Sequence, residues 1–395
     1  MRPVPRSPIV TNILLALSVP VLARLAGTGA DTAARAALIL IFLMGLQTAL
    51  AYFVSGKSES APVLDSGRAR GAIPSRRLRR VLVLRALGFA ALALPVIASF
   101  LLQTKYSWGH WRLGGDVLWL LLPLCFSVTV DSLSSRPYGD EYWTLGKCVV
   151  RGRCKLTAIM RRDLGSSFIK IFFYPLMFVN VEQFLDRFET LRLPETWSAV
   201  EIYRASSVLY LLIDVVFAAS AYALSLKIID NRVRSVNPYP AAWFVTLLCY
   251  DPFWGIAELF IVFEWHANWH IWLESWHALQ FLWLTLILCC FIIYAWSTVE
   301  MGPRFSNLTY RGTVSTGPYR LMKHPAYVSK VVSYWLITVP FVPIQGWAFA
   351  LQQCLMLSIS CSIYYFRAKF EERHLLQFAE YKAYAAGAIA RSARL

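Results

Sequence analysis

The stretch WHALQFLWLTLILCCFIIYAWS, residues 276–297, contains no Asp, Glu, Lys or Arg. An α-helix rises about 1.5 Å per residue, so roughly 20 apolar residues cross the hydrocarbon core of a bilayer. The stretch also lacks the alternation of a barrel strand, and only helices or closed barrels satisfy their backbone hydrogen bonds in lipid. It therefore predicts a membrane-spanning helix.

Similar stretches recur along the whole chain of 395 residues, in which 57% are hydrophobic and 16% are charged. Soluble domains carry about 25% charged residues. The sequence therefore predicts an all-α polytopic membrane protein with about ten transmembrane or membrane-embedded helices. The ten segments are 9–27, 33–54, 80–102, 116–134, 166–184, 206–228, 241–263, 276–297, 330–345 and 347–367. Segment 166–184 contains Lys170 and Pro175, so whether it spans the membrane is left open.

The distribution of basic residues predicts the orientation of these helices. Lys and Arg concentrate in the loops that follow the second, fourth, sixth and eighth segments, whereas EWHANWHIWLESW, residues 264–276, has none. Because basic loops stay in the cytoplasm, we expect both termini there. The net charge of +16 then has a membrane explanation, and we expect no nucleic-acid partner.

The cysteines and histidines do not form a convincing metal-binding pattern. Cys148 and Cys154 flank VVRGR in a basic loop, without the closer spacing and additional ligands of a zinc site. We expect them to be free thiols. His266 and His270 are four residues apart, but this spacing alone is a weak signal. We therefore predict no metal site.

Two polar motifs lie on either side of a hydrophobic hairpin near the C-terminus. The first is GPYRLMKHPAY, residues 317–327, and the second is FEERHLLQFAEYKAY, residues 370–384. Segments 330–345 and 347–367 form the hairpin, so both motifs should return to the same, cytoplasmic face. We expect Glu371 and Glu372 to open an interfacial helix there, although a surface ion pair between Arg367 and Glu371 is a simpler reading of these charges.

Together the motifs resemble the C-terminal signature of the integral-membrane methyltransferases that include isoprenylcysteine carboxyl methyltransferase and the phospholipid methyltransferases. The resemblance covers roughly residues 307–384, a fifth of the chain. It implies S-adenosyl-L-methionine as cofactor, with His324, Tyr327, Glu371 and Glu372 lining the cofactor pocket. It also implies that Arg367 lies near the methyl-accepting group.

The chemistry of the cofactor matches other residues of the two motifs. Its ammonium group needs a carboxylate, its carboxylate needs donors, and its adenine and sulfonium groups suit aromatic faces. Lys323, His324 and the backbone near Gly317 can donate hydrogen bonds. The predicted aromatic residues are Tyr319, Tyr327, Tyr381 and Tyr384.

Three positions depart from the pattern of this family. Lys323 replaces the usual Arg, which keeps the charge but loses the planar fork. Ser329-Lys330 stands where a Gly is common, and Ala379 takes a second Gly position. These departures indicate a divergent branch with its own substrate.

We therefore predict a methyltransferase core at 275–395 behind a transmembrane extension at 1–274. Arg367 and Glu371 are the predicted catalytic residues, and the acceptor is a lipid-like molecule from the bilayer with a carboxylate, phosphate, amine or thiol. An NADPH-dependent membrane reductase of the sterol reductase type is the alternative enzyme, and a scaffold or transporter is the third reading. Asp214 and Glu258, charged residues inside apolar segments, are either further functional candidates or polar helix–helix contacts, and the predicted site does not include them.

Overall fold

The computed structural model describes residues 9–25, 31–56, 75–109, 115–134, 140–153, 157–191, 197–226, 229–258, 268–343 and 345–392. The helices of the N-terminal part are α1 (Ile9–Leu25), α2 (Thr32–Gly56), α3 (Ser75–Trp108), α4 (Gly115–Ser134), α5 (Glu141–Arg151), α6 (Ala158–Thr190) and α7 (Ala199–Ala223). Then follow α8 (Pro240–Leu247), α9 (Phe253–Glu258), α10 (Trp269–Trp272), α11 (His277–Met301), α12 (Pro325–Thr338), α13 (Trp347–Leu375) and α14 (Ala379–Ser392). Two 3-10 turns, η1 (Gly302–Arg304) and η2 (Gly317–Arg320), and two short strands complete the fold.

Among the described residues, seven helices are long and apolar enough to cross a membrane, namely α2, α3, α4, α6, α7, α11 and α13. The protein is thus an all-α integral membrane protein, as the sequence predicts. The count of ten spans stays a prediction, because α1 is shorter and α12 has only 14 residues. Segment 166–184, which was left open, lies within the continuous 33-residue helix α6.

Segment 241–263 is interrupted, as the Asp251-Pro252 step within it indicates. Residues 241–263 do not form a single helix, since α8 ends at Leu247 and α9 begins at Phe253, while residues 259–267 lie outside the described part. Pro252 accounts for the interruption, because proline lacks an N–H and disfavours helical backbone in the preceding residue.

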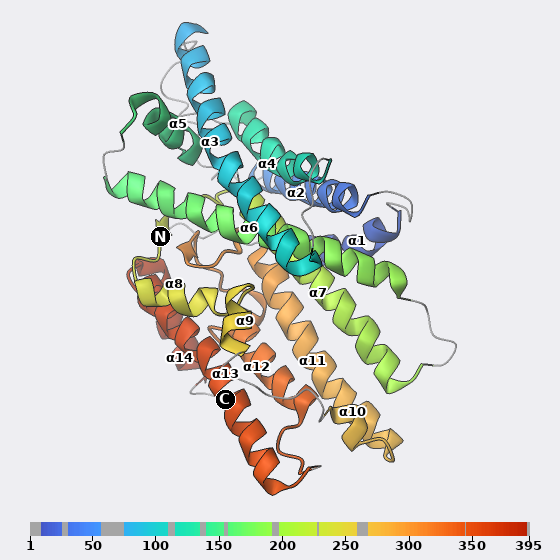
Figure 1. Ribbon diagram of the computed structural model, residues 1–395. Coiled ribbons are helices and arrows are strands. Elements are labelled where there is room, and N and C mark those ends of the chain that lie inside the picture. Colours follow the sequence, from blue (N-terminus) through green and yellow to red (C-terminus); the bar gives the residue numbers. More distant parts are fainter. Residues whose placement is uncertain are drawn as a thin grey trace.

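Helix α6 runs across the middle of the molecule, with α2, α3 and α4 on one side and the C-terminal helices on the other (Figure 1). Helix α7 packs against both α6 and α11 and so joins the two halves. Arg311, in the loop after η1, strengthens this junction by donating to the carbonyl oxygens of Ala221, Leu224 and Pro303. The division at residue 274 stays a prediction.

Helix α5 was not predicted, because an 11-residue amphipathic helix resembles a loop in a hydropathy profile. Asp140 caps its first turn by accepting a hydrogen bond from the backbone N–H of Trp143. It crosses α3 in close contact: a Cβ at Gly88 would lie 1.8 Å from the carbonyl oxygen of Tyr142, and one at Gly146 would lie equally close to that of Leu84. Both positions therefore need glycine.

A buried network of ion pairs surrounds the α3–α5 contact. Arg85 lies 3.0 Å from Asp131 and 2.7 Å from Asp140, and all three side chains are buried. Lys170 of α6 pairs with Glu141, which also accepts a hydrogen bond from Ser166. In these pairs each buried cation has a carboxylate partner, which is the arrangement that makes buried charge tolerable.

The expectation of a free thiol at Cys148 is wrong, because this residue is disulfide-bonded. Its partner lies outside the described residues. Helix α5 ends three residues later at Arg151, and Gly152, with φ of 61°, turns the chain toward α6.

The C-terminal part brings distant loops together. Strand β1 (Ser235–Val236) pairs antiparallel with β2 (Thr309–Tyr310), with Ser235 opposite Tyr310. Helix α13 continues without a break to Leu375, so the expectation that Glu371 and Glu372 open a new helix is wrong. No Pro or Gly occurs between residues 347 and 375, and the helix extends past its apolar part. Helix α14 is the separate terminal helix.

Candidate functional site

The two polar motifs meet in space. The Nε2 atom of His324 lies 3.4 Å from Oε1 of Glu372, and Nζ of Lys323 lies 3.2 Å from the same oxygen. The hydroxyl of Tyr327 donates to Oε2 of Glu371 at 2.9 Å. Residues separated by more than 40 positions in the sequence therefore form one cluster, as the hairpin predicts.

The local sequence explains how the first motif is held. Pro325 opens α12, where its missing N–H has no partner to lose and its fixed φ suits a helix start. His324 thus stands just outside the helix. Tyr327 and Lys330 follow three residues apart and share a helical face.

The cluster borders a pocket whose space, its open mouth included, is about 650 Å³. Five of the predicted site residues line it: Tyr319, His324, Tyr327, Arg367 and Glu371. The other lining residues are Tyr250, Tyr294, Thr298, Met301, Phe305, Ser306, Asn307, Lys323, Ala326, Lys330 and Tyr364. Glu372 does not line the pocket; it forms an ion pair with Lys323 and lies 3.4 Å from Nε2 of His324.

Gly317 supports the pocket without lining it. Its φ is +55°, and a Cβ there would lie 3.0 Å from Oε2 of Glu300 and 3.0 Å from Nε1 of Trp296. The neighbouring Thr316 hydroxyl donates to Glu300. Backbone conformation and close packing therefore both favour glycine at this position.

Tyr319, Tyr381 and Tyr384 form a buried aromatic layer next to the pocket. The hydroxyl of Tyr384 donates to the carbonyl oxygen of Tyr319 at 2.8 Å. The hydroxyl of Tyr381 is buried and has no hydrogen-bond partner among the described residues. Burial, followed by the charges of Glu371 and Glu372, raises the pKa of Tyr381, so its hydroxyl stays protonated and is an unused donor.

Arg367 is held by neutral groups. Its Nη2 donates to Oδ1 of Asn307 and, at 3.3 Å, to the hydroxyl of Tyr250. Its guanidinium carbon lies 4.9 Å from the ring centroid of Tyr327. Arg367 is buried, and the described residues show no ion pair between it and Glu371, so the surface-pair reading is wrong.

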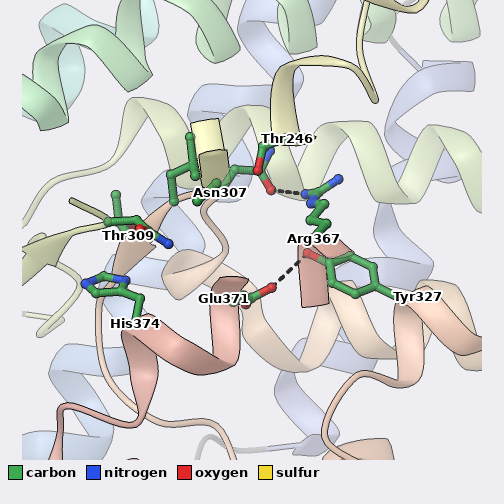
Figure 2. Close-up of a pocket in the computed structure, with 10 residues that line it drawn as sticks. Thr246, Asn307, Thr309, Tyr327, Arg367, Glu371 and His374 are labelled. Atoms are coloured by element: carbon green, nitrogen blue, oxygen red, sulfur yellow. Dashed lines mark hydrogen bonds between the residues drawn. The ribbon is translucent and has the colours of Figure 1, made fainter. Parts of the chain in front are cut away.

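A second, smaller pocket of about 310 Å³ lies on the other side of these residues. Figure 2 shows Arg367 bonded to Asn307 and Tyr327 bonded to Glu371, with Thr246, Thr309 and His374 around the same space. Asn307, Tyr327, Arg367 and Glu371 line both pockets and therefore form the wall between them.

Sequence reasoning missed several of the lining residues. Asn307 was not a predicted site residue, and it bonds to Arg367 and to the hydroxyl of Tyr250. Asp214 was noticeable in the sequence, because it is a charged residue inside an apolar segment. Its carboxylate accepts hydrogen bonds from Thr298 at 2.5 Å and from Tyr294 at 3.2 Å, and both of these donors line the larger pocket. The side chain of Glu258 and all of His266 lie outside the described part.

Comparison of the chain with family models, with curated proteins and with solved structures gives no match. The function therefore has to be inferred from the chemistry of these residues.

Proposed function

We propose that this protein is a membrane-embedded methyltransferase that uses S-adenosyl-L-methionine and acts on a lipophilic acceptor at the cytoplasmic face. The observation that supports this most is that His324, Tyr327 and Glu371 line one pocket, with Glu372 in contact with His324. These are the positions that the family resemblance implies for the cofactor, and the resemblance alone did not require them to be in contact.

The residues present suit the groups of the cofactor. Glu371, which lines the pocket, offers a carboxylate to the ammonium group. Tyr381 is not a lining residue but packs in one cluster with Tyr319, which lines the pocket, and its unused hydroxyl can donate to a ligand carboxylate. The pocket wall contains the rings of Tyr250, Tyr294 and Tyr364, which offer aromatic surface to the adenine ring. An orphaned buried donor next to two carboxylates is costly in an empty protein, which favours a polar ligand here.

When bound, the cofactor would supply an electrophilic methyl group. The chain itself would supply position and exclusion of water. Arg367 is fixed by Asn307 and by the ring of Tyr327, so it presents a rigid cation to an acceptor. Such preorganisation reduces the entropy lost on reaching the reactive geometry, and it requires no covalent intermediate on the protein.

The surroundings of the pocket fit an acceptor that comes from the bilayer. Helices α11 and α13, which supply the wall, expose large apolar side chains on their outer faces, including Leu286, Ile292, Leu351 and Leu355. Because lipid-facing surfaces of membrane proteins are apolar, the pocket lies among helices that contact lipid tails. The basic loops of the sequence support a pocket mouth at the inner leaflet.

A membrane reductase remains the second candidate, because Lys323, Lys330 and Arg367 all line the pocket and could bind the phosphates of NADPH. Against it, Glu372 already neutralises Lys323, and Glu371 would repel a phosphate. S-adenosylhomocysteine should raise the melting temperature of the purified protein, and NADPH should not. The opposite result would favour the reductase.

The proposal is tested by incubating membranes that contain the protein with radiolabelled methyl donor and identifying labelled lipids by mass spectrometry. We expect a labelled lipid with the wild-type protein and none with His324→Ala. Label that is equally abundant without the protein would refute the proposal.

A further inference from the structure

Lys330 differs from the other lysine of the pocket in what surrounds its ammonium group. Its Nζ lies 5.1 Å from the ring centroid of Tyr364, 5.8 Å from that of Tyr294 and 5.9 Å from that of Tyr334. The three rings come from α13, α11 and α12. Lys330 is six residues beyond His324, which is about 9 Å along the helix axis and places it toward the inner end of the pocket.

No carboxylate in the described part of the chain lies within 4 Å of the Lys330 ammonium. Asp214 is near enough to interact with it electrostatically, but both oxygens of that carboxylate already accept hydrogen bonds from Thr298 and Tyr294. Ring faces attract a cation but do not neutralise it. The charge of Lys330 is therefore only partly compensated.

Arg367 likewise lacks a carboxylate partner among the described residues. Its partners are an amide oxygen, a phenol hydroxyl and two aromatic rings. The acidic lining residue, Glu371, accepts a hydrogen bond from Tyr327 instead of pairing with either cation. Arg367 is buried and Lys330 is half-buried, and two such cations without a carboxylate partner in one pocket are costly unless a ligand brings negative charge.

We propose that Lys330 and Arg367 form an anion-binding subsite at the inner end of the pocket, which takes the phosphate or carboxylate group of a bilayer lipid. The further step, that this lipid is the methyl acceptor, rests on the proposed function. The subsite then selects anionic acceptors over amines, because an ammonium group beside two cations would be repelled.

The subsite also removes the need for a base that deprotonates the acceptor. An anionic oxygen can attack the methyl carbon directly while the carbon–sulfur bond breaks and its electron pair goes to sulfur. The anion becomes a neutral ester if it is a carboxylate, and the sulfonium becomes a thioether. No proton has to leave the acceptor, so the engagement of Glu371 with Tyr327 does not prevent the reaction.

Native mass spectrometry of the purified protein tests the subsite without any assumption about methyl transfer. The probes are dioleoylphosphatidic acid, oleic acid and dioleoylphosphatidylcholine, offered at equal concentration. We expect the wild-type protein to retain one of the two anionic lipids in preference to the zwitterionic one. Lys330→Gln should weaken that retention about ten- to hundredfold, the range for loss of a charge-assisted contact. Equal retention of all three lipids by the wild-type protein would overturn the proposal.

Lys369 provides a matched control. It is also a lysine of the C-terminal half and also lies over a tyrosine ring, 5.4 Å from the centroid of Tyr365, but it is exposed and does not line the pocket. Lys369→Gln should leave lipid retention unchanged. A loss equal to that of Lys330→Gln would show a general charge effect and refute a specific subsite. Lys330→Arg should retain much of the binding, because it keeps the charge.

Two further measurements separate this inference from the proposed function. Inorganic phosphate at millimolar concentration should not displace the retained lipid; if it does so fully, the occupant is a soluble anion. S-adenosylhomocysteine should bind Lys330→Gln within about threefold of the wild-type affinity, since Lys330 lies apart from His324 and Glu372. An equal loss of both ligands would place Lys330 in the cofactor site and overturn the proposal. If no protein binds S-adenosylhomocysteine but anionic lipid is retained, the proposed function fails and the subsite stands.

Discussion

Two regions of this protein hold buried or half-buried cations whose partners differ. Around the α3–α5 contact, Arg85 and Lys170 each have a carboxylate partner. In the C-terminal pocket, Lys330 and Arg367 are surrounded by rings, an amide and hydroxyls. The first arrangement is electrostatically complete and holds helices together. The second lacks negative charge, as expected of a site whose counter-charge comes from a ligand.

The largest loss of stability should come from removing one member of a buried ion pair. Glu141→Gln leaves the buried ammonium of Lys170 without a counter-charge, and removing one member of a buried pair costs about 3–5 kcal/mol. Thermal unfolding in detergent measures this. Glu141→Gln combined with Lys170→Met should recover most of the loss. Lys330→Met, in contrast, should change the free energy of unfolding little, and an equal loss there would erase the difference between the two regions.

A substitution that disturbs the backbone of the pocket loop should destabilise the protein more than one that removes a charge. Gly317→Ala adds a Cβ 3.0 Å from Glu300 and Trp296 at a positive φ. A non-glycine residue in this backbone region costs about 1–3 kcal/mol. We expect a lower melting temperature and weaker binding of S-adenosylhomocysteine. Gly109→Ala, also at positive φ but with no atom within 4 Å of a Cβ, isolates the backbone contribution.

Two tyrosines sharpen the comparison at the level of single hydroxyl groups. Tyr174 donates to the carbonyl oxygen of Leu120 at 2.6 Å in the N-terminal half, whereas the hydroxyl of Tyr381 has no partner among the described residues. Tyr174→Phe should therefore cost about 1 kcal/mol of stability. Tyr381→Phe should leave stability unchanged and weaken S-adenosylhomocysteine binding several-fold, as isothermal titration calorimetry can measure. A reversed pattern would contradict a ligand-binding role for Tyr381.

Lowering the pH should gradually weaken the ion-pair network around the α3–α5 contact. Burial opposes ionisation of Glu141, but the charge and hydrogen bond of Lys170 outweigh it and lower the pKa of this carboxyl below its usual value. The stabilisation is therefore present above the ordinary glutamate pKa of about 4.3 and is lost as the pH falls through the lowered folded value. Melting temperatures from pH 7 to pH 3 should show this for the wild-type protein. The decline should be shallower in Glu141→Gln, which has no carboxyl to titrate.

The sequence predicted much of the fold because long apolar segments have few alternatives in lipid. Helices α2, α3, α4, α6, α7, α11 and α13 all coincide with predicted segments. The errors occurred where local signals compete. Pro252 divides an apolar segment. Helix α5 is too short and too amphipathic for a hydropathy profile to show it. Helix α13 extends past its apolar part to Leu375.

The site was predictable only as far as its motifs extend. His324, Tyr327 and Glu371 could be named because they lie within recognisable stretches, and the hairpin explains why they meet. Lys330 and Asn307 could not be assigned, because their importance comes from tertiary neighbours on other helices. A lysine near the start of an apolar segment looks like an interfacial anchor until the three surrounding tyrosines are known.

Equilibrium dialysis of the purified protein with radiolabelled S-adenosyl-L-methionine tests the central claim most directly, namely that the two motifs share one cofactor. Glu371→Gln and Lys369→Gln serve as the variant and its exposed control. The account predicts saturable binding of one molecule per chain, weakened at least tenfold by Glu371→Gln and unaffected by Lys369→Gln. Absence of saturable binding by the wild-type protein, or equal binding by Glu371→Gln, would contradict it.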